Sequence, residues 1–208
     1  MKASDMEFLS NSLSFDQTWL ENEFSSPELI TYKSILELYI SNLIGCLGGN
    51  NPKEDILSCF NLKVESIKDE RLYEVFDSMR HAFTSYASGG LYDLYIYQSN
   101  ESWYPKIVLK SELKPNDILD LPSKLVIYRG CNGIELATGK YGQSWSTNFE
   151  VAEEFAYQHY NSQSWYKKEN RCILKASVSR CDVFFSRQNH HEKEVSVNTE
   201  KLINVQKT

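Results

Sequence analysis

The pattern of apolar and polar positions divides this chain into a helical first part and a strand-rich second part. Up to residue 121, apolar residues recur at helical spacing. This spacing predicts a helical segment that opens after Pro27, a short helix that starts at Asn51-Pro52, a helix over 67–86 and a weaker one over about 12–22. The helix over 67–86 has one apolar stripe that we assign to the core, formed by Leu72, Val75, Phe76, Met79 and Phe83.

Shorter apolar runs, typical of strands, dominate the rest of the chain. Two runs before residue 121, at 91–97 and 103–109, already alternate enough to predict strands. Later runs predict strands at 125–128, 144–147, 172–178, 183–185, 194–197 and 202–205. Asn148 is a good N-cap for a helix over about 149–160, whose early acidic residues suit the helix dipole.

This segregation predicts an α+β fold. We expect a mainly helical N-terminal region, 1–121, followed by a strand-rich core, 122–208, with one continuous domain as the alternative. The length of 208 residues and the hydrophobic content of 41% fit a globular protein with a real core.

The five cysteines are scattered and form no C-x-x-C pair, which predicts free thiols in a reducing compartment. Metal binding by Cys172 and Cys181 with His190 and His191 is a weaker alternative, and we expect no metal. The sequence shows neither a signal peptide nor an apolar run able to cross a bilayer. We therefore expect a protein without a membrane partner that acts in a cytoplasm, of its producer or of a recipient cell.

The net charge of −6 is unevenly distributed along the chain. Residues 122–208 carry 12 Lys and Arg against 9 Asp and Glu, whereas residues 1–121 carry 10 against 19. The less acidic second part suits an anionic ligand such as a dinucleotide, although a chance division of surface charge gives the same numbers. No block of basic residues indicates a surface for duplex DNA.

Arg129 ends an apolar run and is followed by Gly130. A guanidinium at a strand end offers a rigid fork for phosphate oxygens, and a residue without Cβ lets a ligand approach the backbone. The alternative is an arginine paired with a carboxylate of a neighbouring helix.

Two further pairs of polar residues are each two positions apart. Ser144 and Ser146 share one face of a strand, where they can bind a ribose and orient a carboxylate, or simply satisfy neighbouring backbone groups. If Glu192 and Glu194 lie in an extended segment, their carboxylates share a face about 6–7 Å apart. Such a pair can stabilise an oxocarbenium-like state and activate a nucleophile; the alternative is a solvated acidic turn.

The order of these pieces resembles the Arg-Ser-Glu class of mono-ADP-ribosyltransferases, the cholera-toxin-like branch. The matching residues are Tyr128-Arg129-Gly130, Ser144-Trp145-Ser146-Thr147 and Glu192-Lys193-Glu194. The resemblance covers about residues 122–208 and implies a split, bent β-sandwich around an NAD site, with a helical region packed alongside. The family's serine motif is usually Ser-Thr-Ser, so the register of the second hydroxyl is open by one residue.

The resemblance also implies how NAD is bound. Arg129 would hold the phosphates and ribose, and the backbone of Gly130 would meet the nicotinamide amide. Ser144 would position the catalytic carboxylate, with Ser146 or Thr147 supporting the site.

Two glutamates would carry the chemistry. By the resemblance, Glu194 would bind the nicotinamide ribose and stabilise the oxocarbenium state, and Glu192 would face the acceptor, next to a target-recognition loop at 186–191. Aromatic candidates for stacking on nicotinamide or adenine are Phe155, Tyr157, Trp165 and Tyr166, with core packing as the alternative.

The function expected from the resemblance is transfer of ADP-ribose from NAD to a macromolecule, by a toxin or effector. The Glu-x-Glu pair is associated in this family with protein arginine as the acceptor, which we place first, and RNA or DNA bases come second. An NAD glycohydrolase and a non-catalytic binding module remain as alternatives. A chain that poisons cells is also expected to have a neutralising antitoxin as a partner.

Overall fold

A computed structural model describes residues 1–65, 67–98, 103–163 and 165–208. The chain forms two compact units, Met1–Val108 and Leu109–Thr208. This boundary lies earlier in the chain than the one predicted from the sequence, between residues 121 and 122. The reason is that the segment after Leu109 forms backbone hydrogen bonds with the sheet of the second unit. Leu113 N–H donates to the carbonyl of Phe184 at 2.8 Å, and Asp117 N–H donates to that of Ser186 at 3.1 Å.

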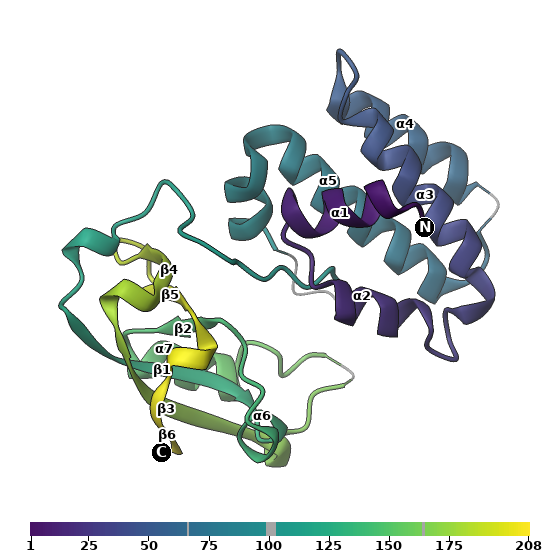
Figure 1. Ribbon diagram of the computed structural model, residues 1–208. Coiled ribbons are helices and arrows are strands. Elements are labelled where there is room, and N and C mark those ends of the chain that lie inside the picture. Colours follow the sequence, from purple (N-terminus) through teal and green to yellow (C-terminus); the bar gives the residue numbers. More distant parts are fainter. Residues whose placement is uncertain (66, 99–102, 164) are drawn as a thin grey trace. The chain divides into compact units, whose positions relative to one another are not determined.

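The first unit is helical (Figure 1). Its helices are α1 (Ala3–Asn11), α2 (Gln17–Phe24), the 3-10 turn η1 (Ile30–Tyr32), α3 (Lys33–Cys46), α4 (Pro52–Val64) and α5 (Glu70–Ile96). Local signals explain where several helices begin. Asp16 and Asp69 cap α2 and α5 through their side chains, and α4 begins with Pro52. The predicted apolar stripe is confirmed as core, since its five residues are at most 4% exposed.

Two strand predictions in this unit are wrong. Residues 91–96 are helical and extend α5 beyond a kink at Gly89 and Gly90, where Gly90 has a φ of +67°. Leu94 and Tyr95 are buried, so tertiary packing rather than alternation decides this segment. The run at 103–109 forms an isolated bridge between Ile107 and Phe15.

The second unit contains a six-stranded antiparallel sheet with the order β4-β5-β2-β1-β3-β6 (Figure 1). The strands are β1 (Lys124–Asn132), β2 (Ser144–Ser146), β3 (Arg171–Ser179), β4 (Val183–Arg187), β5 (Glu194–Val197) and β6 (Ile203–Lys207). Each strand predicted after residue 121 overlaps one of these, and the α+β class is confirmed. The short helix α6 (Ile134–Thr138) follows β1, and α7 (Phe149–Tyr157) follows β2.

Two apolar clusters pack within this unit. The larger one includes Ile127, Trp145, Leu174 and Val195, contributed by β1, β2, β3 and β5. In the smaller one α7 contributes Ala152 and Ala156, which pack with Ile173 of β3. Asn148 caps α7 by accepting a hydrogen bond from Glu150 N–H at 2.8 Å, as the sequence predicted.

All five cysteines are free thiols. Cys131 and Cys172 face each other across β1 and β3 with their sulfurs 3.9 Å apart, and burial raises the pKa of Cys131. In the described part of the chain, no helix combines the length and the apolar character needed to span a bilayer.

Candidate functional site

Neighbouring strands bring together three residues that are far apart in the sequence. Arg129 lies on β1, Ser144 on β2 and Glu194 on β5, and β2 pairs with both other strands. The Ser144 hydroxyl donates to Oε1 of Glu194 at 2.8 Å, and Nη1 of Arg129 donates to the backbone carbonyl of Ser144 at 2.6 Å. These two contacts link the three residues into one continuous polar site.

Strand alternation explains why the side chains of Ser144 and Glu194 converge. Arg129 projects to the other face, because its neighbour Tyr128 pairs with Ser146, and it reaches the backbone of Ser144. In the register of β2 and β5, Ser144 lies opposite Ser196, and Ser146 lies opposite Glu194. Directly opposed residues of an antiparallel pair project to the same face, so all four side chains share one face. Trp145 alternates to the other face and is buried with the apolar cluster.

The guanidinium of Arg129 is held by a residue that the sequence analysis did not single out. Glu135, on α6, accepts hydrogen bonds from Nε and Nη2 of Arg129, both at 2.9 Å. The same carboxylate accepts the backbone N–H of Gly142 at 2.9 Å. A Cβ on Gly142 would collide with the guanidinium, so a glycine here lets the arginine lie flat against the chain.

This bidentate ion pair determines the direction in which the pKa of Arg129 is shifted. Burial alone would lower the pKa of Arg129, but its contact with Glu135 outweighs burial, and the pKa is raised above its usual value. The pairing with a helix carboxylate is the alternative that the sequence left open. The side chain of Arg129 is 22% exposed, and its contacts with Glu135 and Ser144 leave two of its five N–H donors unused. No local pattern in the sequence indicates this role for Glu135, which follows the strand in a short helix.

Gly130 serves a purpose different from the one inferred from the sequence. A Cβ at this position would collide with the backbone of α7, at Ala152, Phe155 and Ala156. The missing side chain therefore allows the helix to pack closely on β1, and the space that we expected to admit a ligand is filled by that helix.

Ser146 and Thr147 stabilise the turn that leads into β5. The Ser146 hydroxyl donates to the carbonyl of Glu192 at 2.7 Å and accepts the N–H of Asn148 at 3.0 Å. Thr147 donates to the side-chain oxygen of Gln188 at 2.6 Å. Both hydroxyls therefore bond to groups of the protein itself.

Gln188 is the centre of this framework and was not recognised from the sequence. Its side-chain nitrogen donates to the carbonyls of Lys193 and Glu194 at 3.2 and 3.1 Å. Its backbone N–H donates to Asp117 at 2.6 Å. The residue thereby ties the turn to the segment before β1 and places the start of β5.

Glu192 lies in the turn, outside β5. Lys193 has a φ of +44°, so residues 192–194 are not extended, and the expectation of two carboxylates on one strand face is wrong. The carboxylate of Glu192 lies 3.8 Å from Nδ1 of His190 and 3.8 Å from Nε2 of His191. Desolvation lowers the pKa of His190, with smaller effects in the same direction from Arg187 and His191, against an opposing effect of Glu192.

A cluster of rings continues from α7 into the loop that follows it. Phe155 and Tyr160 both lie 4.7 Å from the ring of His159, and Trp165 lies 5.2 Å from Tyr160. Trp165 is 45% exposed. Of the two other aromatic candidates, Tyr157 packs against the smaller apolar cluster, and the hydroxyl of Tyr166 donates to the carbonyl of Tyr157 at 3.1 Å.

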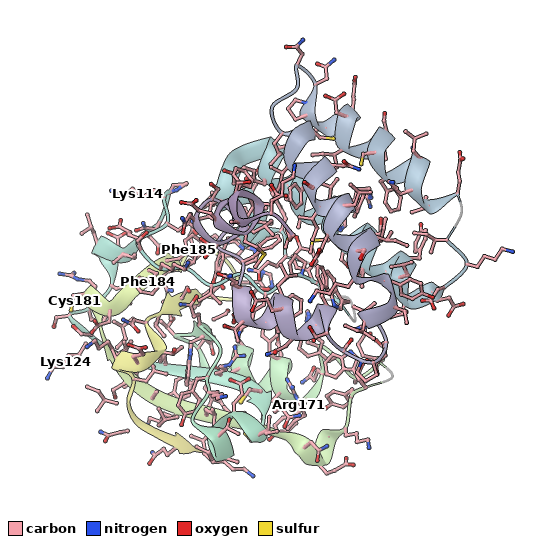
Figure 2. All side chains as sticks on the ribbon, turned by 45° about the vertical axis from the view of Figure 1, so that its right-hand side comes forward. Lys114, Lys124, Arg171, Cys181, Phe184 and Phe185 are labelled. Atoms are coloured by element: carbon pink, nitrogen blue, oxygen red, sulfur yellow. The ribbon has the colours of Figure 1, made fainter. Side chains whose placement is uncertain are left out.

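Arg171, labelled in Figure 2, lies at the start of β3 and contacts both this cluster and the helix. It donates to the carbonyls of Phe155 and Ala156 at 3.0 and 3.2 Å, and its guanidinium lies 5.6 Å from the centre of the Tyr160 ring. Burial raises the pKa of Tyr160, whereas Arg129 and Arg171 lower it and Glu192 raises it further. Tyr160 therefore lies within electrostatic range of both the arginine and the acidic parts of the site.

None of the protein families, curated proteins or solved structures to which the chain was compared matches it. The resemblance to ADP-ribosyltransferases therefore stays a prediction from the sequence motifs.

Proposed function

We propose that the chain is a mono-ADP-ribosyltransferase that uses NAD as its substrate and modifies a macromolecular acceptor. The observation that carries this proposal is the contact between Ser144 and Glu194, extended to Arg129 through the carbonyl of Ser144. The motif residues are separated by 15 and 50 positions along the chain, and these two hydrogen bonds join them, which supports the proposal.

In the proposed reaction Glu194 acts on the nicotinamide ribose. The bond between the ribose and the pyridinium nitrogen breaks, and its electron pair neutralises the departing nicotinamide. Positive charge then develops on the ribose, and a fixed carboxylate beside it lowers the barrier electrostatically. The hydroxyl of Ser144 holds that carboxylate in place through its bond to Oε1.

NAD would bind along the strip between Arg129 and the ring cluster. The unused donors of Arg129 suit the pyrophosphate, and the exposed face of Trp165 suits a stacked base. Tyr160 contacts the ring of Trp165 and lies within the electrostatic influence of Arg129.

The acceptor would approach from the turn that holds Glu192, whose side chain is 30% exposed. An acceptor nitrogen attacks the ribose carbon, forms the new bond and releases a proton, for which Glu192 is the nearest proposed base. Protein arginine is the first candidate and RNA or DNA bases are the second. We propose a cytoplasmic toxin or effector as the biological setting.

Labelled NAD incubated with the purified chain and with protein or RNA fractions of a bacterial lysate tests the proposal. We expect label in the protein fraction, and a decrease of roughly 100-fold or more in the Glu194→Gln variant, as for the loss of a main electrostatic group. Glu200→Gln, at an exposed position of the same unit, is the matched control and should keep full activity.

The same experiment separates the alternatives. Label in RNA would retain the enzyme class and change the acceptor. Free ADP-ribose without label in any acceptor, unchanged in Glu192→Gln, would indicate a glycohydrolase. If NAD is consumed in no fraction, the enzyme proposal is wrong.

A further inference from the structure

Three groups with metal-binding chemistry meet on the turn before β5. His190, His191 and Glu192 each offer one ligand atom, and these atoms lie within 4.8 Å of one another. The two imidazole rings are neighbours, with their centres 4.1 Å apart. Nδ1 of His190 is buried and has no hydrogen-bond partner within the described residues, so it is available to a ligand other than the protein.

We propose that this turn binds one divalent transition-metal ion of the Zn²⁺ type, and that the bound ion withdraws Glu192 from the acceptor. The second half of this inference rests on the proposed function, whereas the first half does not. Two imidazoles with one carboxylate form a donor set that suits Zn²⁺, whereas Mg²⁺ and Ca²⁺ prefer oxygen ligands.

The distance from the carboxylate of Glu192 to each imidazole is close to what such an ion needs. Zn²⁺ bonds nitrogen and oxygen at about 2.0–2.2 Å, which places the ligand atoms of a tetrahedral site about 3.3–3.6 Å apart. In the structure, one oxygen of Glu192 lies 3.8 Å from the nitrogen of His190, and the other lies 3.8 Å from that of His191. Small rotations of these side chains bring the groups together, and the fourth position is left for water.

The backbone beneath the ligands is already held in place. The hydroxyl of Ser146 binds the carbonyl of Glu192, and Lys193 N–H donates to the carbonyl of His190 at 3.0 Å. Because these bonds order the turn before any ion arrives, binding needs to order only the side chains.

The ion would act selectively on the proposed reaction. Glu192 would bind the metal and would then no longer face the acceptor. Glu194 and Ser144 lie outside the ligand set and keep their mutual hydrogen bond. Metal binding should therefore block transfer to the acceptor and leave NAD cleavage with water intact.

Calorimetric titration of the full chain with Zn²⁺ tests the binding itself. Cys181 is an exposed thiol, so the titrations use a Cys181→Ser background. We expect one bound ion, and binding weaker by about tenfold or more in either His190→Ala or His191→Ala, as for the loss of one ligand in three. His81→Ala, at an exposed position of the first unit, should bind as tightly as the background protein.

Spectra and activity complete the test. Co²⁺ in place of Zn²⁺ should give the absorption of nitrogen and oxygen ligands, without a thiolate charge-transfer band. Zn²⁺ affinity that is unchanged in both histidine variants, or a thiolate band, would overturn the site. Labelling of the acceptor that persists at saturating Zn²⁺ would overturn the regulatory role. An absence of NAD turnover without any metal would instead refute the proposed function and leave the binding result unaffected.

Discussion

Replacement of Gly130 by alanine distinguishes two roles for this residue, support of a helix and admission of a ligand. The added Cβ would collide with three backbone atoms of α7, in Ala152, Phe155 and Ala156. A flexible side chain could turn away from such a contact, but the backbone of a helix packed on a sheet cannot. The whole helix must therefore move away from β1, by on the order of 1 Å.

The cost of this shift can be derived from the packing. Overpacking of a well-filled core costs about 1–3 kcal/mol, and a collision with rigid backbone belongs at the upper end of that range. We therefore expect Gly130→Ala to lower the free energy of unfolding of the second unit by about 3 kcal/mol. The shift would also strain the bonds from Arg171 to the carbonyls of Phe155 and Ala156.

Native-state hydrogen exchange suits this measurement because it reports on each unit separately. The amides of β1, β3 and α7 should exchange faster in the variant, whereas those of the first unit should not change. Gly133→Ala is the matched control, since a Cβ there would only make an ordinary contact with the carbonyl of Asn170, at 3.6 Å. If Gly130→Ala leaves exchange unchanged and only raises KM for NAD, the packing argument is wrong and Gly130 admits the ligand instead.

Three further predictions follow from individual contacts. Glu135→Gln removes the counter-charge of the part-buried Arg129 and should cost about 1–2 kcal/mol in urea unfolding, less than for a fully buried pair; an unchanged midpoint would contradict this. Gln188→Ala releases two carbonyls at the start of β5, so kcat should fall several-fold while KM for NAD changes little, as steady-state kinetics would show; an equal kcat would rule out its positioning role. Burial opposes the ionisation of Asp16, but bonds from the start of α2 and from Lys106 outweigh it and lower the pKa of Asp16 below 3.8. The ionised Asp16 therefore stabilises the folded state above pH 3.8, and this stabilisation is lost as the pH falls through the lower pKa of the folded state. Acid unfolding followed by circular dichroism should accordingly depend less on pH in Asp16→Asn.

Much of the secondary structure could be predicted because its signals are local. The strands of the second unit follow from runs of apolar residues, and α7 starts where Asn148 supplies a cap. The stripe on α5 could be assigned to the core because helical spacing places its residues on one face. Arg129, Ser144 and Glu194 could also be identified from their residue types and their order along the chain.

The contacts within the site depend on tertiary structure. No local pattern indicates that Glu135 holds Arg129, or that α7 fills the space beside Gly130. The left-handed backbone of Lys193, which turns Glu192 out of the strand, lies in a turn held by bonds from Gln188 and Ser146. The sequence by itself determined which segments become helices or strands in most of the chain, because spacing and capping act over a few residues. Only the tertiary structure decided what each polar group touches, because these partners come from other strands and helices that meet once the sheet has formed.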